Sequence, residues 1–353
     1  MNGKARDICR RAWPFCAAFA ASPAFASDPS PVPDSEPALA PASAASAVSG
    51  EAVPGLAAKP EDKTAISLAV ETSVFYDSNV LDGRWTPGAS VDPTTLRPED
   101  SARKKGEIGH SAGASASLRM PLEAGLRLDV DASVFVLDFD GSEDDEANVQ
   151  IAAGLSYALD SQTRALVQLT GSDRWYGHTL STAARGVRAQ LSRDLGGREK
   201  ISLTVDASWL TSGYGDQLSG RELVGSLSYQ TGLGRSANLI LGAYARSDSL
   251  RSAEYSSWDG GGYASLMTYL GPSLLGGVTL GVGRIQLGPG SAYLFATRRS
   301  DWNMFGSIYL TTRKPVLLGV YPYLDYGFGR RWSVIPAIST DHSRLRFSLR
   351  RQF

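Results

Sequence analysis

The last residues of the chain alternate strictly between apolar and polar side chains. Leu345, Phe347, Leu349 and Phe353 carry the apolar phase, while arginine, serine and glutamine fill positions between them. A repeat of two places successive side chains on opposite faces of an extended chain, so the segment predicts a β-strand with one apolar face. Such a strand fits the wall of a membrane barrel or an exposed strand of a β-sandwich.

The same alternation runs from Ile66 to the end of the chain and helps to choose between these two folds. Charged residues such as Arg127, Asp129 and Asp206 lie in the middle of alternating segments, opposite a continuous apolar face. In a sandwich the polar face would point to bulk water, whereas in a porin-like barrel it would point into a wet lumen.

The number of alternating segments and the lengths of the connections favour the barrel. We count about fourteen segments, most of them longer than a usual soluble strand. Longer connections alternate with shorter, turn-like ones, as in barrels with long outer loops and short periplasmic turns. The longer set is 77–106, 140–147, 176–183, 211–219, 248–256, 288–297 and 331–341. We therefore expect an all-β transmembrane outer-membrane β-barrel of about 14 antiparallel strands over residues 64–353.

The N-terminal segment predicts export from the cytoplasm. Basic residues precede a short apolar run at 13–21, and Ala24 and Ala26 form a small-x-small cleavage site, so residues 1–26 are predicted to be a signal peptide. Residues 27–63 are rich in proline and alanine and predict a disordered periplasmic linker. Both cysteines, Cys9 and Cys16, lie in the segment that would be removed. The mature chain is then expected to have no disulfide and no thiol nucleophile.

Composition excludes other classes. The formal net charge is −1, and a nucleic-acid partner is not expected because such proteins carry a basic patch or stripe. No apolar run of about 18 residues occurs beyond the first few dozen residues, so no spanning helix is expected.

Polar residues of the last strands predict a charged lumen. The phase of the alternation points Asp325, Arg344, Arg346 and Arg350 inward, where opposite charges of neighbouring strands can pair and hold the barrel closed. The register between these strands is not readable from the sequence, so individual pairs stay unassigned.

Catalytic and metal-binding patterns are weak in this chain. His110, His178 and His342 are far apart in the sequence and are expected at interfaces or in loops, so no metal site and no cofactor are predicted. His178 with Ser181 suggests a hydrolase, but no orienting group or oxyanion motif accompanies them. We expect a protein that is not an enzyme, with a barrel hydrolase as the weaker alternative.

A set of short motifs appears in a fixed order along the chain. The set comprises Tyr76, Asp77, Ser78 and Asn79 after the first strand, then Arg299, Asp301, Gly319, Pro322, Arg330, Ser333 and the terminal Phe353. This order resembles the C-terminal barrel of the surface lipoprotein assembly modifier (Slam) family, over roughly residues 64–353. The resemblance implies a fourteen-stranded barrel in the outer membrane of a Gram-negative cell.

The resemblance also implies a function in protein translocation. Family members help to move lipoproteins, and in some cases soluble proteins, from the periplasm to the cell surface. Members of that type carry a periplasmic helical-repeat domain before the barrel, and residues 27–63 show no such repeat. If capture of the cargo depends on that domain, either a separate periplasmic partner replaces it or the protein does a different job. The expected partners are therefore outer-membrane lipid, an exported lipoprotein or secreted cargo, and that periplasmic protein. The alternative function is a passive porin-like channel for small solutes.

Overall fold

The computed structural model describes residues 63–353 except 79–90, 93–96, 99–105, 124, 140–144, 177–178, 235, 289–299, 317 and 334–339. The predicted signal peptide with Ala24 and Ala26, almost all of the predicted linker, and the motif residues Asn79 and Arg299 lie outside the described residues. No helix in the described part of the chain is long and apolar enough to cross a membrane.

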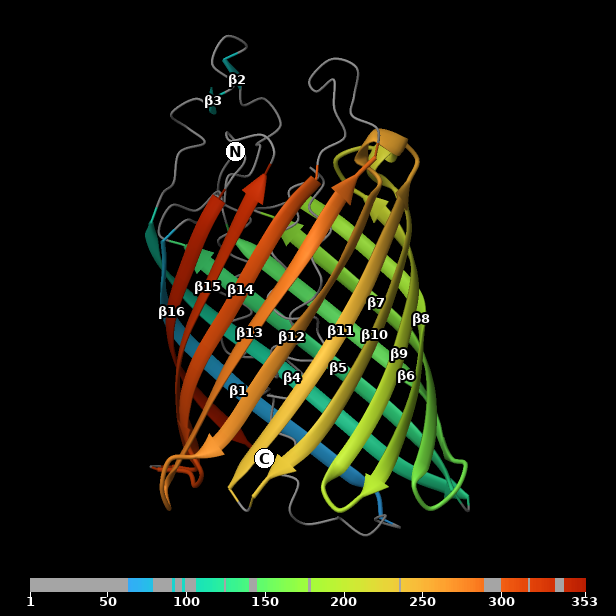
Figure 1. The fold of residues 1–353 in the computed structure, drawn as a ribbon, viewed down its shortest axis with the longest axis vertical. Helices are drawn as coiled ribbons and strands as arrows, with labels where there is room; N and C mark the ends of the chain where they lie inside the picture. The colour runs from blue at the N-terminus through green and yellow to red at the C-terminus, as the bar shows by residue number, and fades with distance from the viewer. Residues whose placement is uncertain are drawn as a thin grey trace, which may run out of the picture.

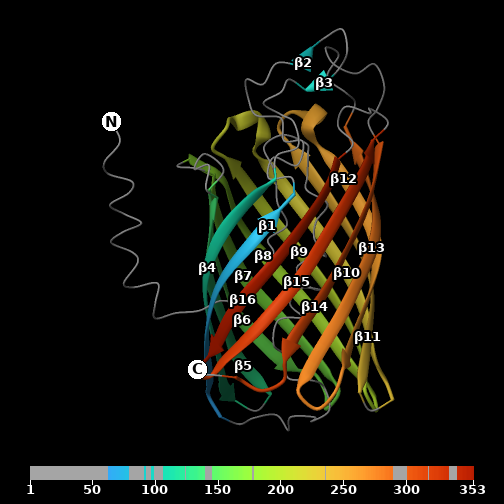
Figure 2. The same cartoon turned by 90° about the vertical axis from the view of Figure 1, so that its left-hand side faces the viewer.

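Fourteen antiparallel strands close into one barrel, which confirms the predicted fold class. Each strand pairs with its neighbours in the sequence, and β1 closes the ring by pairing with β16 (Figure 1, Figure 2). The barrel strands are β1 (Ala65–Asp77), β4 (Glu107–Glu123), β5 (Leu126–Phe139), β6 (Glu146–Ala158), β7 (Thr163–Tyr176), β8 (Thr179–Gly196), β9 (Glu199–Ser212), β10 (Gly220–Leu233), β11 (Ala237–Leu250), β12 (Ser257–Tyr269), β13 (Leu274–Leu287), β14 (Ser300–Thr312), β15 (Val320–Ser333) and β16 (Thr340–Gln352).

The connections differ at the two ends of the barrel. The end drawn at the top of Figure 1 carries the longest connection, between β1 and β4, which includes the two-residue strands β2 (Val91–Asp92) and β3 (Arg97–Pro98). It also carries the 3-10 helices η2 (Asp216–Leu218) and η3 (Ala253–Tyr255). The opposite end carries most of the short turns. Long loops face the outside in outer-membrane barrels, so we refer to these ends as the outer and periplasmic rims.

One predicted loop is shorter than the sequence suggested. The connection expected at 176–183 is reduced to residues 177–178, because β7 extends to Tyr176 and β8 begins at Thr179. A register shift occurs between Arg174 and Trp175, which marks a β-bulge. The polar sequence resembles a loop because it lacks apolar alternation, yet residues 179–183 belong to β8.

A periplasmic turn shows how local chemistry ends a strand. The Asp160 side chain accepts hydrogen bonds from the backbone N–H groups of Gln162 and Thr163, both at 2.7 Å. These bonds, led by that from Gln162, hold the pKa of the Asp160 carboxyl below its usual value. An aspartate that bonds its own backbone two residues on is a common turn device, and it lets β6 reverse directly into β7.

The outer wall of the barrel is apolar and the inner wall is polar. On β1, Ile66 and Val74 expose 67% and 48% of their surface on the outside, whereas Glu71 and Asp77 on the inner face expose 8% and 1%. The apolar set of the sequence alternation is therefore the set that meets lipid. Apolar residues on the inner face form small clusters rather than one core, such as Phe75 with Leu137 and Phe139.

Tryptophans mark the outer rim on the lipid-facing wall. Trp209, Trp258, Trp302 and Trp332 expose 58%, 46%, 52% and 41% of their surface, and each lies near the outer end of its strand. Tryptophan favours the level of the lipid headgroups, because its ring is apolar and its N–H is polar.

The strand phase of β9 gives a direct test of the inside-outside assignment. Val205 is exposed on the outer wall at mid-strand, and its neighbour Thr204 faces the lumen. Val205→Arg should destabilise the folded barrel in a bilayer by about 2–4 kcal/mol, because it places a charge near the midplane. Thr204→Arg should be tolerated better. The fraction of heat-resistant folded barrel on a gel measures both effects, and equal losses would contradict the assignment.

Candidate functional site

The barrel closes where the first and last strands meet, and this junction is the candidate site. We call the pairing of β1 with β16 the seam. Its register runs from Ala69 opposite Gln352 to Asp77 opposite Arg344, nine paired positions, whereas β1 pairs with β4 over thirteen. The seam is thus shorter than the pairing on the other side of the same strand.

Backbone hydrogen bonds extend both ends of the seam. At the periplasmic end the N–H of Phe353 donates to the carbonyl of Leu68 at 2.7 Å. At the outer end Ser78 N–H donates to the carbonyl of Ser343 at 2.8 Å, and the Ser78 hydroxyl accepts from Ser343 N–H at the same distance. The motif residues Ser78 and Phe353 therefore act through the backbone of the seam. The Phe353 ring itself is 56% exposed.

A buried arginine joins three strands across the seam. The Arg346 Nε lies 2.6 Å from the Asp325 carboxylate on β15, and its Nη1 lies 3.8 Å from Glu71 on β1. All three side chains face the lumen and are largely buried, with 9%, 16% and 7% of the Arg346, Asp325 and Glu71 side chains exposed. Arg346 thus sits between carboxylates on both neighbouring strands.

Two stacked tyrosines lie on one side of this ion pair. The Arg346 guanidinium lies 6.0 Å from the centre of the Tyr323 ring, and Tyr323 stacks on Tyr309 with ring centres 5.5 Å apart. Rings of this kind exclude water and lower the local dielectric constant, which strengthens the attraction between opposite charges and raises the cost of separating them.

A second pair closes the outer end of the seam. Arg344 donates to one oxygen of Asp77 through Nη2 at 2.7 Å and Nε at 2.9 Å. The Asp77 side chain is 2% exposed, and His342 Nε2 lies 3.4 Å from the same carboxylate oxygen. The guanidinium also lies 5.2 Å from the centre of the Phe75 ring. Asp77 therefore brings together two neighbouring basic side chains of β16.

The remaining predicted residues lie at several places around the seam. Arg350 faces inward and is opposite Glu71 on β1 and Tyr321 on β15. Gly319 adopts φ 78° in the turn before β15, a left-handed conformation that suits glycine. The Pro322 carbonyl accepts from the Thr311 hydroxyl at 2.9 Å.

Three other motif residues lie near the outer rim. Asp301 is 1% exposed and is opposite Ser333 in the register of β14 and β15. Tyr76 and Arg330 instead lie on the outer wall, so they are not part of the lumen. The motif order therefore marks seam, turn and wall positions rather than one binding pocket.

Sequence reasoning missed several inward charges. His342, expected at an interface or in a loop, is 6% exposed on the inner face of β16. Arg331, next to the motif residue Arg330, is 1% exposed. Both residues lie at positions of the alternation that face the lumen, so the alternation could have predicted their inward orientation.

A further lumen network lies on β10 and β11, away from the seam. Arg246 contacts Glu222 at 2.8 Å and Asp248 at 3.0 Å, and the three side chains are at most 13% exposed. The sequence alternation could have predicted this network too, because all three residues lie between outward-facing neighbours and so face the lumen. The inner wall therefore carries more than one set of buried ion pairs.

The candidate hydrolase pair lies only in part within the described residues. The Ser181 hydroxyl donates to the Arg174 carbonyl at 3.1 Å, and His178 lies outside the described residues. No group of three or more histidine, cysteine, aspartate or glutamate residues among those described could hold a metal ion.

Comparison with known proteins identifies the barrel. The family model described as surface lipoprotein assembly modifier matches residues 93–353. No curated protein matches the chain.

A solved outer-membrane barrel shares the fold at low sequence identity. A loop-deletion mutant of the Vibrio cholerae outer membrane protein OmpT has 7% identity and a TM-score of 0.50, covering 82% of this chain and 99% of its own. The Acinetobacter baumannii outer membrane channel DcaP has 11% identity and a TM-score of 0.47, covering 82% and 97%. The similarity to the OmpT mutant shows the fold alone.

The buried pair of Asp325 on β15 and Arg346 on β16, beside the seam, gives a stability prediction. Asp325→Asn should lower the free energy of unfolding by about 3 kcal/mol, because it leaves Arg346 buried without its nearest carboxylate. As a matched contrast, Asp216→Asn should change it by less than about 1 kcal/mol, because Asp216 and its partner Arg251 are 85% and 63% exposed. Urea unfolding in lipid vesicles measures both. Equal effects would show that burial at the seam contributes nothing.

Proposed function

The chain belongs to the surface lipoprotein assembly modifier family, and we propose that it assists the translocation or surface display of lipoproteins or secreted proteins. The protein is an outer-membrane barrel of a Gram-negative envelope. The observation that carries the proposal is the extent of the family match, which begins in the first long connection and runs to the last residue of the closing strand.

The seam supports a role for the barrel wall in this process. A closed barrel has no free strand edge, so a polypeptide that enters the wall or the lumen must displace contacts already made there. The shorter pairing of β1 with β16 is the place where fewer backbone bonds need to break. The contacts of Arg346 with Glu71 and of Arg344 with Asp77, which join β16 to β1, would keep this place closed between export events.

The cargo could replace these contacts without leaving charges unpaired. The carboxylates that face the arginines of β16 would stay near them or pair with basic side chains of the cargo; they are Asp77, Asp325 and Glu71. The arginines could in turn pair with acidic side chains of the cargo. Exchange of partners costs less than exposure of a buried charge to an apolar surface. In this proposal the barrel acts without catalysis, and a separate periplasmic protein delivers the cargo.

A deletion strain tests the proposal, with point variants to locate the effect. Removal of the gene should lower the amount of one or more lipoproteins or secreted proteins at the cell surface, measured by surface labelling and proteomics. Re-expression of Asp325→Asn should change the amount of that cargo, because Arg346 loses the carboxylate that holds it beside Glu71 at the seam. Asp206→Asn is the control, since it breaks a lumen pair of the same length, with Arg188 at 2.6 Å, on β8 and β9 away from the seam; the Arg188 and Asp206 side chains are 38% and 24% exposed.

Two other outcomes would each reject part of the proposal. Unchanged surface proteins in the deletion strain, together with reduced uptake of small solutes, would reject export and support a porin-like channel. Equal effects of Asp325→Asn and Asp206→Asn on the cargo would keep export but reject the special role of the seam.

A further inference from the structure

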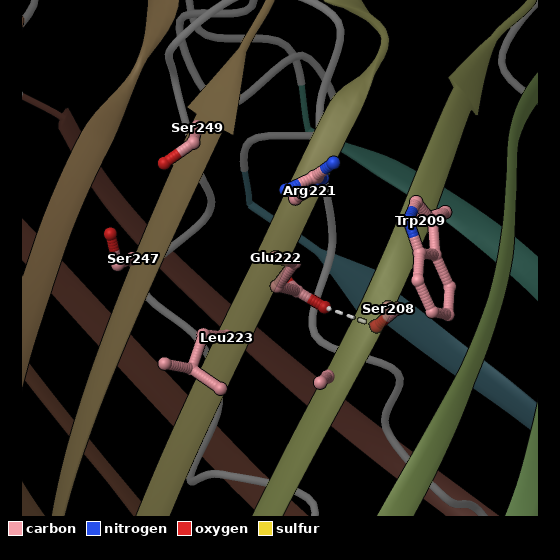
Figure 3. A pocket seen from close by; sticks show the side chains of 8 residues that line it. Ser208, Trp209, Arg221, Glu222, Leu223, Ser247 and Ser249 are labelled. Atoms are coloured by element: carbon pink, nitrogen blue, oxygen red, sulfur yellow. Dashed lines mark hydrogen bonds between the residues drawn. The ribbon is translucent and has the colours of Figure 1, made fainter.

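A groove on the lipid-facing wall lies near the outer rim, between two exposed tryptophans. It has a volume of about 350 Å³ and is lined mainly by outward-facing residues of β9, β10 and β11. The lumen-facing residues Ser208 on β9 and Glu222 on β10 also line it. Figure 3 shows Trp209 on β9, Arg221 and Leu223 on β10, and Ser247 and Ser249 on β11. The volume corresponds to about a dozen water molecules.

The groove exists because β11 presents small side chains where its neighbours present large ones. In the register, Ser249 is opposite Arg221, and Ser247 lies between Leu223 on one side and Trp258 on the other. Trp209 is opposite Arg221 on the remaining side. A lipid-facing wall gains most from apolar side chains, so two serines beside an arginine are an exception that membrane insertion alone does not explain.

Arg221 differs from the other outward arginines of this rim. Arg185 contacts Asp173 at 2.7 Å, and the guanidiniums of Arg284 and Arg330 lie 5.7 Å and 5.3 Å from the rings of Trp302 and Trp332. Arg221 makes no ion pair or hydrogen bond with any other residue that the structure describes.

The nearby carboxylates are already engaged elsewhere. Glu222, next to Arg221 in the sequence, faces the lumen and is paired with Arg246. Asp216 in the adjacent connection is paired with Arg251 at 2.8 Å. Among the described residues, the exposed cation in the groove therefore has no acidic partner, and an anion from the surroundings would pair with it.

We propose that this groove binds the phosphorylated headgroup of an outer-leaflet glycolipid. The planar guanidinium of Arg221 matches two phosphate oxygens, and the serine hydroxyls can bond to phosphate or sugar oxygens. The Trp209 ring suits the level of the headgroups. Leu223 lies two residues from Arg221, about 7 Å further along β10 toward the membrane centre, where an acyl chain begins. From the rim toward the membrane centre, the groove thus presents a cation and hydroxyls for the headgroup and then an apolar surface for the acyl chains.

Binding of a defined lipid to the full-length protein tests the proposal. The probe is hexa-acylated, bis-phosphorylated lipid A, titrated into the protein in a non-ionic detergent and measured by native mass spectrometry. Arg221→Gln should weaken binding about tenfold, as expected for loss of a charged hydrogen-bonding partner. The control Arg284→Gln removes a rim arginine outside the groove and should change affinity less than about threefold.

A second variant keeps the charge and fills the space. Ser249→Leu should also weaken binding about tenfold while it keeps Arg221, and it decides the question if Arg221→Gln fails to fold. Lipid A without phosphates should bind the wild-type protein no better than it binds Arg221→Gln. Unchanged binding in both groove variants, equal loss in Arg284→Gln, or equal binding of the dephosphorylated lipid would each overturn the proposal.

Discussion

The structure depends on the need to pair every backbone polar group within the membrane. Lipid offers no hydrogen-bond partners, so a β-structure can span the bilayer only if its sheet closes on itself. In this chain the closure is made by strands at opposite ends of the barrel sequence, β1 and β16. All other strand pairs join neighbours in the sequence and can form locally. The seam alone requires the two ends of the barrel to meet, and it does so over nine positions.

The lumen-facing charges are arranged around that closure. Arg346 on β16 contacts Asp325 on β15 and Glu71 on β1. Arg344 pairs with Asp77 at the outer end of the seam. Buried ion pairs contribute less to stability than their Coulomb attraction suggests, because each ion has lost its hydration. Their stronger effect is on specificity, since a register shift by one residue would turn these charges toward lipid. We infer that the seam is fixed in register by charge and remains the weakest pairing of β1 in backbone hydrogen bonds.

The sequence predicted the fold well, because alternation and turn spacing are local patterns. The phase of β9 and β16 followed directly from their side chains, and so did the approximate number of strands. Register is a collective property of the whole ring, so the partners of Arg344 and Arg346 could not be assigned. The polar stretch 176–183 looked like a loop because its strand continuation is set by pairing and a bulge. The groove around Arg221 depends on three strands at once, and no single segment shows it.

The role of the seam in export can be tested by locking it. Ser73 and Ser348 are opposite each other across the seam and face the lumen, at a spacing that a disulfide can bridge. The Ser73→Cys, Ser348→Cys variant should lose cargo at the cell surface when oxidised and regain it on reduction. The matched control is Ser67→Cys with Ser117→Cys, which locks β1 to β4 instead, and it should export normally. Full export through a completely cross-linked seam would contradict the account.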